Sequence, residues 1–146
     1  MQPGLQLQGS GPRFSVTFAA DLTAIESVVE GVMAVAMQAP AAQDRELEIE
    51  TSLREALANA IIHGSGKDPS RNVVCTAQVE NGELLITVTD SGGKLEEKKL
   101  PDPTTADNLY SGSGRGVHMM KQMMDEVEYR IEPGKKTEVR MRIRPR

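Results

Sequence analysis

The sequence predicts an α/β sandwich of two layers, in which a mixed, mostly antiparallel sheet carries helices on one face. Three observations predict it. After a start rich in Gln, Gly and Pro, apolar and polar residues alternate, which is typical of a half-buried strand. Apolar residues then recur every three or four positions, as in amphipathic helices. Further on, Asn81-Gly82 joins two β-branched runs, the strongest short-range signal for a hairpin.

Length and composition indicate a single soluble domain. A chain of 146 residues can bury one substantial core. Its residues are 38% hydrophobic and 26% charged, and no apolar run approaches the roughly 20 residues needed to span a membrane, so we expect a cytoplasmic protein. Residues 1–12 lack the pattern of a signal peptide and are predicted to form a flexible tail before a folded domain at 13–146. The single cysteine, Cys75, fits a reducing compartment and a place in the core.

The distribution of charge argues against a nucleic-acid partner. A formal net charge of -4 does not favour the neutralisation of many phosphates. Arginines do alternate along the last predicted strand, at Arg140, Arg142, Arg144 and Arg146. Because no aromatic residues are interleaved for base stacking, we interpret them as the solvated outer face of that strand.

The first elements are predicted to be a strand and a helix. Residues 14–18 alternate apolar and polar side chains, which indicates a short strand at a sheet edge. A helix is predicted from Asp21 to about Gln38, because the apolar period changes to three and four residues. Thr23 and Glu26 can form a capping box at its start, and Pro40 stops it.

A second helix is predicted to end at Gly64, a natural C-cap. Its core-facing residues are predicted to be Leu47, Ile49, Leu53, Leu57 and Ile61. On another face Glu55, Asn59 and His63 recur every fourth residue, so they stack one turn apart. A carboxylate can take a proton from a hydroxyl, and an amide oxygen suits Mg²⁺, so Glu55 and Asn59 resemble half of a phosphoryl-transfer site. Polar residues at this spacing are also ordinary on a solvated helix face.

The second half of the chain is predicted to hold two hairpins, a long loop and a helix. Strands at 73–79 and 84–89 meet across Asn81-Gly82, and strands at 125–131 and 137–143 form the closing hairpin. Residues 94–113 show no sustained periodicity, which favours a functional loop or lid. The helix that follows has its apolar positions at Val117, Met120, Met123 and Met124.

Two further groups of residues suit a nucleotide. Asp90 follows a strand and precedes Gly92, so it can accept a hydrogen bond from an amine such as that of adenine while a ligand approaches the backbone. Glycines at alternate positions before a helix leave N–H groups for phosphate, with Arg115 as a charged contact. These glycines are Gly112, Gly114 and Gly116. Either group alone is weak evidence, since such turns and loops are common.

Taken together, the order of these motifs resembles the ATP-binding (Bergerat) fold shared by gyrase, Hsp90, histidine kinases and MutL. Within that fold the chain is most similar to the bacterial anti-sigma factor serine/threonine kinases. The pattern from Glu55 to Gly64 matches their N box, Asp90-Ser91-Gly92 their adenine box, and Gly114-Arg115-Gly116 their second glycine box. The run Met124 to Tyr129 is close to what these regulators carry next, and the resemblance spans roughly Phe14 to the C-terminus.

The resemblance implies a role for each matched residue. Glu55 would be the catalytic base that activates a hydroxyl, Asn59 would hold Mg²⁺, and Asp90 would bind the adenine amine. The glycines Gly92, Gly112, Gly114 and Gly116, with Arg115, would lie against ATP. One position departs from the pattern, because Lys94 stands where the family often has a second glycine, so that Gly93 takes this part or the turn is remodelled.

Three functions remain open at this stage. The first is a protein kinase that phosphorylates an anti-sigma factor antagonist of the STAS type and sequesters a sigma factor, with a homodimer suggested by the family. The second is an ATP-binding regulatory module that binds a partner without kinase activity. The third is a detached ATPase domain of a histidine kinase, which is disfavoured because both histidines, His63 and His118, lie inside the predicted ATP domain.

Overall fold

A computed structural model of the protein describes residues 5–8, 11–90, 115–132 and 135–145. The elements, in chain order, are β1 (Leu5–Gln8), β2 (Gly11–Ala19), η1 (Leu22–Ala24), α1 (Ile25–Ala36), η2 (Pro40–Ala42), α2 (Glu46–Asn59), η3 (Ala60–Gly64), β3 (Asn72–Glu80), β4 (Glu83–Asp90), α4 (Arg115–Met123), β5 (Glu126–Glu132) and β6 (Lys136–Ile143). No helix among these residues is long and apolar enough to cross a membrane.

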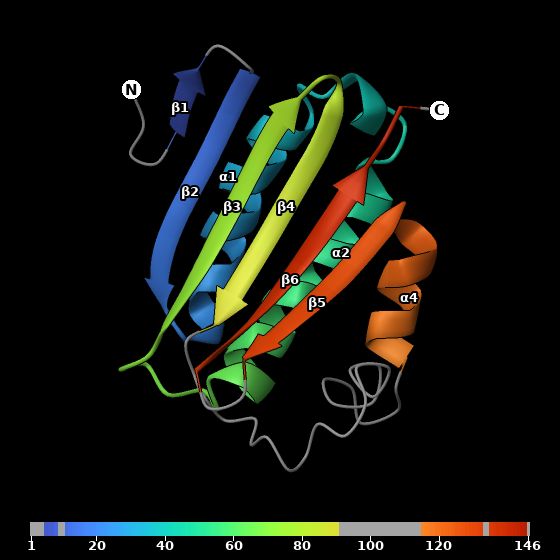
Figure 1. Ribbon diagram of the computed structural model, residues 1–146. Coiled ribbons are helices and arrows are strands. Elements are labelled where there is room, and N and C mark those ends of the chain that lie inside the picture. Colours follow the sequence, from blue (N-terminus) through green and yellow to red (C-terminus); the bar gives the residue numbers. More distant parts are fainter. Residues whose placement is uncertain (1–4, 9–10, 91–114, 133–134, 146) are drawn as a thin grey trace.

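The elements form two layers, as predicted. One sheet has the strand order β1-β2-β3-β4-β6-β5, and the long helices α1 and α2 cover one of its faces (Figure 1). All pairings between the described strands are antiparallel. A sheet with one covered face explains the alternation of buried and half-exposed residues along its central strands.

The start of the chain differs from the sequence prediction. Leu5–Gln8 forms strand β1, with Gln8 opposite Gly11 of β2, in a segment expected to be a flexible tail. β2 therefore lies between β1 and β3 and is not the edge strand that we expected. Residues 5–8 lack β-branched and aromatic side chains, so local propensity gave no signal, and the strand depends on its pairing with β2.

The first helix has a different cap from the one predicted. Asp21 precedes the turn η1 and α1, and its carboxylate accepts hydrogen bonds from the backbone N–H and the hydroxyl of Thr23, both at 2.9 Å. These bonds lower the pKa of Asp21. The capping box of Thr23 with Glu26 is therefore wrong, because Glu26 instead pairs with Arg54 of α2 at 2.7 Å. An aspartate side chain is among the best N-caps.

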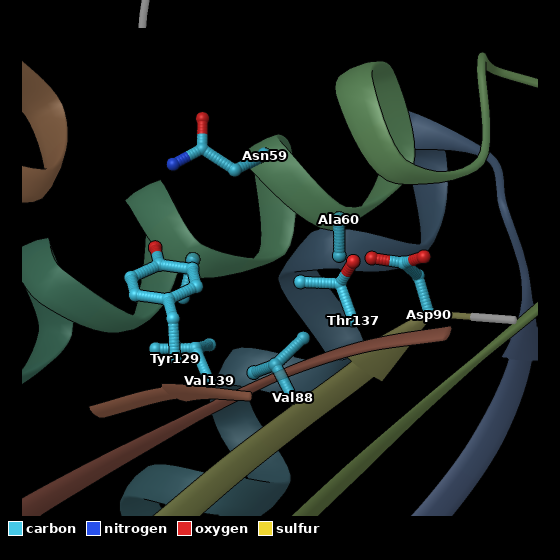
Figure 2. Close-up of a pocket in the computed structure, with 8 residues that line it drawn as sticks. Asn59, Ala60, Val88, Asp90, Tyr129, Thr137 and Val139 are labelled. Carbon is cyan, nitrogen blue, oxygen red and sulfur yellow. The ribbon is translucent and has the colours of Figure 1, made fainter. Parts of the chain in front are cut away.

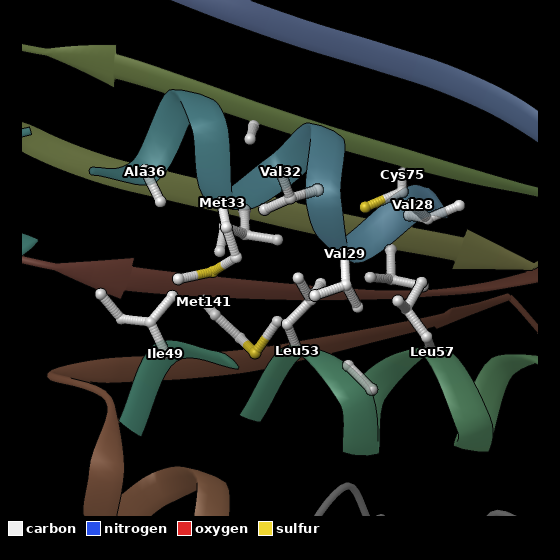
Figure 3. Close-up of a cluster of buried hydrophobic side chains, with 14 of the residues drawn as sticks. Val28, Val29, Val32, Met33, Ala36, Ile49, Leu53, Leu57, Cys75 and Met141 are labelled. Carbon is white, nitrogen blue, oxygen red and sulfur yellow. The ribbon is translucent and has the colours of Figure 1, made fainter. Parts of the chain in front are cut away.

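The core lies between the two long helices and the sheet (Figure 3). Its fully or almost fully buried members include Val28, Val29, Val32, Ile49, Leu53, Leu57, Cys75 and Met141. The prediction that Leu47 faces this core is wrong, since its side chain is 79% exposed. A helix turns about 100° per residue, so Leu47 points about 200° away from Ile49 and lies on the opposite side.

The central hairpin is the one that the sequence predicts. β3 and β4 pair from Val73 opposite Asp90 to Glu80 opposite Glu83. The two turn residues, Asn81 and Gly82, have φ values of 55° and 79°. Positive φ at both positions is what a type I′ turn requires, and Asn-Gly supplies it at low cost.

The closing hairpin extends the sheet beyond β4, with β6 next to β4 and β5 at the edge. β6 pairs with β4 on one side and with β5 on the other, so the last strand of the chain lies inside the sheet. Its outer face carries Arg140 and Arg142 as predicted, whereas Arg144 follows the strand and Arg146 lies outside the described residues. Arg142 donates to Glu83 at 2.9 Å and Arg140 lies 3.8 Å from Glu138. Both arginines are about one-third exposed, so this face is solvated and its charges are paired with carboxylates.

Candidate nucleotide-binding site

The candidate site is a pocket between the last turns of α2 and the ends of the neighbouring strands (Figure 2). The helix supplies Ala56, Asn59 and Ala60, and the strands supply Val88, Asp90, Tyr129, Thr137 and Val139. Apolar groups form most of its walls and a few polar groups lie among them. This composition is typical of small-molecule sites, although the empty volume between the described residues, about 200 Å³, is smaller than the roughly 300–1,000 Å³ of such sites.

Two polar side chains lie together at the strand end of the pocket. Asp90 ends β4 and stands directly opposite Thr137 of β6 in the register. Both are buried, with exposed fractions of 3% and 5%. Asp90 continues the alternation of Leu84, Ile86 and Val88, which turns its side chain towards the helix layer. A carboxylate beside a hydroxyl can recognise a group that both donates and accepts, as the amine edge of a purine does.

Asn59 is the polar residue that α2 contributes. It is 6% exposed, and its Nδ2 has no hydrogen-bond partner among the described residues. A buried amide without a partner costs about 1–3 kcal/mol, so such groups are rare unless a ligand or water completes them. Asn59 and Asp90 thus approach the pocket from two layers of the fold, and the structure brings these two predicted site residues together.

Gly64 explains how Asp90 fits beneath the helix. α2 continues into the wide π-helical turn η3, in which the N–H of Ser65 donates to the carbonyl of Ala60 at 2.9 Å. A Cβ added to Gly64 would lie 2.8 Å from Oδ1 of Asp90, and closer still to its Oδ2 and carboxyl carbon. Gly64 was predicted to be the C-cap of the helix, but the residues with positive φ after the helix are Gly66 and Lys67, with φ of 64° and 58°. The glycine at 64 instead makes room for a carboxylate.

The remaining predicted residues of α2 lie near the pocket but do not line it. Glu55 is half-buried one turn before Asn59 and is not among the described residues that line the pocket. His63 is exposed in the last turn. Its place at a helix C-terminus suits an imidazole through the helix dipole.

The glycine boxes fall mostly outside the described residues. Gly92, Gly93, Gly112 and Gly114, together with Lys94, lie in the undescribed segment 91–114. Arg115 and Gly116 form the start of α4. The roles given to these residues in phosphate binding stay predictions.

Of the residues that line the pocket, the sequence predicted only Asn59 and Asp90 as site residues, and it missed three that lie on the closing hairpin. Tyr129, Thr137 and Val139 come from β5 and β6, and the alternation of these strands indicates only which face each residue takes. Their neighbours in the sheet depend on the insertion of β6 beside β4. The strand order, which no local pattern contains, was the missing information.

An arginine network holds α4 against α2. Arg45 is 4% exposed, and it donates to Asp125 at 2.8 Å and to the carbonyl of Met123 at 2.6 Å. Asp125 also accepts the backbone N–H of Arg144 at 2.7 Å. Asp125 belongs to the run Met124 to Tyr129 that supported the family resemblance. Its hydrogen bonds give a structural reason for an aspartate in that run.

The described residues fit a magnesium ion only as part of a larger complex. Among them, no group of three His, Cys, Asp or Glu side chains could hold a metal ion by itself. Magnesium is commonly bound through one or two protein ligands plus substrate phosphates, so a single amide such as Asn59 suits that role.

Comparison with known proteins identifies sequence relatives among bacterial regulators. The chain is 37% identical over 111 residues to the anti-sigma F factor of Geobacillus sp. (strain WCH70), which covers 74% of this chain and 75% of that protein. The anti-sigma F factor of Geobacillus stearothermophilus is 38% identical with the same coverage. That of Clostridium perfringens (strain SM101 / Type A) is 38% identical over 98 residues, 65% of this chain and 69% of that protein.

A solved structure and a family model also match this chain. The crystal structure of the RsbU and RsbW domains of Rv1364c from Mycobacterium tuberculosis matches with a TM-score of 0.65 and 18% identity, over 91% of this chain and 32% of that chain. The model of the histidine kinase-like ATPase domain matches residues 18–143. ATP binding is implied by this domain. The chain belongs to the histidine kinase-like ATPase domain family and, within it, to the bacterial anti-sigma factors.

Proposed function

We propose that this anti-sigma factor is a protein kinase that uses ATP and Mg²⁺ to phosphorylate a serine or threonine of an anti-sigma factor antagonist. The observation that carries the proposal is the buried amide of Asn59, whose Nδ2 has no hydrogen-bond partner in the described part of the chain, in a pocket that ends at Asp90. Glu55 stands one turn before Asn59 on the same helix. A base, a metal ligand and an amine acceptor are thus available within one small region of the fold.

The pocket would hold the nucleotide by its base. Asp90 would accept a hydrogen bond from the adenine amine and Thr137 would contact the ring beside it. Ala60, Val88 and Val139 would pack against the flat faces of the base. The Asn59 oxygen would hold Mg²⁺, which supplies neutralisation of phosphate charge when bound. Gly112, Gly114 and Gly116, with Arg115, would enclose the phosphates.

Glu55 would act on the substrate hydroxyl. Its carboxylate would accept the proton as the hydroxyl oxygen attacks the γ-phosphorus, and ADP would leave from the opposite side. Most of the acceleration would come from positioning and from charge neutralisation, because phosphoryl transfer needs little other chemistry from the protein. This assignment requires Glu55 to approach the phosphates while it stays outside the walls of the base pocket.

The partners are proposed from the relatives. Their name, anti-sigma F factor, says that they act against a sigma factor. We propose that this chain sequesters a sigma factor, releases it in exchange for a STAS-type antagonist, and works as a homodimer. Phosphorylation of the antagonist would end the exchange.

The decisive experiment replaces the proposed base. Glu55→Ala should abolish transfer of labelled γ-phosphate to a purified antagonist and leave the Kd for ATP within about threefold of the parent value, since the carboxylate does not line the base pocket. Glu46→Ala, at an exposed position of the same helix, is the matched control and should retain transfer. Transfer by the Glu55 variant at the parent rate would refute this assignment.

A second function is favoured by one observation, which is that Glu55 is not among the described residues that line the pocket. In this alternative the chain binds ATP and changes its affinity for a partner without phosphorylating it. The same assay separates the two functions, because a module that only binds yields no phosphorylated antagonist although ATP alters the complex.

A further inference from the structure

We propose that Gly64 is a positioning residue that makes the pocket selective for a 6-aminopurine, by leaving space for the carboxylate of Asp90. The inference rests on the proposed function in one respect, the contact between Asp90 and the base. In this inference Gly64 acts through its missing side chain and not through its backbone conformation.

The carboxylate of Asp90 occupies the space in which a side chain at position 64 would lie. The three heavy atoms nearest to an added Cβ are Oδ1, Oδ2 and the carboxyl carbon of Asp90, all within 2.8 Å. Real Cβ atoms essentially never approach other heavy atoms closer than 3.0 Å, so any side chain at 64 must displace the carboxylate or the helix. Burial of both residues leaves little free volume for either movement.

The strand that carries Asp90 resists displacement. Its backbone is paired on both sides, with Val73 of β3 and with Thr137 of β6. A shift of the strand would break pairing with two neighbours. The side chain of Asp90 is therefore the part that moves most easily when a group is added at 64.

The helix end is fixed as well. The N–H of Ser65 donates to Ala60 at 2.9 Å, and that of Lys67 donates to Ile61 at 2.8 Å. Ile61 is fully buried in the core. The wide π-helical turn thus holds Gly64 over Asp90, and such turns occur often at functional sites.

A displaced carboxylate has a specific consequence for binding. A hydrogen bond to an amine needs a donor–acceptor distance near 2.9 Å, so a shift of several tenths of an ångström weakens it. The loss falls on nucleotides with a 6-amino group and spares purine riboside triphosphate, which lacks it. The ratio of the two Kd values therefore reports on Asp90 and not on general damage.

The experiment measures that ratio by calorimetry in the full chain. We expect Gly64→Ala and Asp90→Ala each to lower the affinity for ATP about tenfold, with little effect on purine riboside triphosphate. The double variant should bind like Asp90→Ala alone, because the methyl group then occupies the place of the removed carboxylate. Gly31→Ala is the control, since its Cβ would crowd the Phe14 ring, away from the pocket, and should lower Tm while keeping the ratio.

The outcomes distinguish this inference from the proposed function. If Asp90→Ala leaves the ratio unchanged, the base contact in the proposed function is wrong. If Asp90→Ala removes the selectivity and a folded Gly64→Ala retains it, the role of Gly64 is refuted. Should Gly64→Ala fail to fold, recovery of folding in the double variant supports the steric relationship, and continued failure overturns it.

Discussion

The guanidinium of Arg45 donates to the carboxylate of Asp125 at 2.8 Å, across a separation of 80 residues. Arg45 precedes α2, and Asp125 follows α4 and leads into β5. The same arginine also donates to the carbonyl of Met123. The contact thus fixes the end of α4, whose first turn carries Arg115 and Gly116, against the helix that carries Asn59.

We predict that Arg45→Met destabilises the protein by about 3 kcal/mol, because it leaves a carboxylate without its buried partner. The value lies at the lower end for buried pairs since Asp125 is 29% exposed. Unfolding in urea measures the change. Arg54→Met, which removes ion pairs among exposed side chains, should cost under about 1 kcal/mol. Equal losses of stability in the two variants would contradict the prediction that the buried ion pair of Arg45 contributes more than the exposed pairs of Arg54.

Asn59→Ala should lose magnesium-dependent affinity without losing stability. The Nδ2 of Asn59 is buried and has no partner among the residues that the structure describes, so its removal costs the fold little and can stabilise it. The affinity for ATP in Mg²⁺ should fall about tenfold or more towards the value measured in EDTA. Asn59→Asp keeps an oxygen ligand and should retain most of the magnesium effect. A variant that unfolds at lower urea and keeps the effect would show that Asn59 is structural.

Two leucines of α2 should behave oppositely. Leu53→Ala removes a fully buried side chain and should cost about 2–5 kcal/mol, because it leaves a cavity in the core. Leu47→Ser changes a side chain that is 79% exposed and should alter the free energy of unfolding by less than about 0.5 kcal/mol. Urea unfolding of both variants tests the orientation of the helix. A large loss at Leu47 would mean that its side chain is covered by another surface in solution.

Burial raises the pKa of Cys75 from 9.0 to about 12. The folded pKa then exceeds the unfolded value, so the neutral thiol contributes its full stability below pH 9 and loses it progressively between pH 9 and 12. At pH 10 the loss from this group is roughly 1 kcal/mol relative to pH 7. Cys75→Val should show a smaller loss over the same interval. Identical pH dependence in both proteins would rule out the thiol as its source.

The features that the sequence predicted well are local ones. The hairpin at Asn81-Gly82 was predicted because two residues specify the turn, and the alternation of β4 placed Asp90 on the helix-facing side. The choice of Asp90 and Asn59 as site residues also needed the family resemblance, since each motif alone is common. The structure then placed both beside one pocket.

The features that were missed depend on contacts between distant segments. Thr137 meets Asp90 because β6 is inserted beside β4, and Arg45 meets Asp125 because α4 returns to the start of α2. Gly64 was interpreted from its place at a helix end, whereas the nearby carboxylate of Asp90 is the reason for a glycine there. The strand at residues 5–8 lacked any propensity signal and depends on a partner strand.

The place of β6 has a consequence for synthesis of the protein. A growing chain on the ribosome has made Asp90 long before Thr137, and until residues 136–143 emerge β4 keeps one open edge. The candidate pocket therefore lacks Thr137 and Val139 until β6 has been synthesised. A product cut short before β6 would expose that edge to other nascent chains, and we expect it to aggregate and to be degraded rather than to persist as a partial regulator.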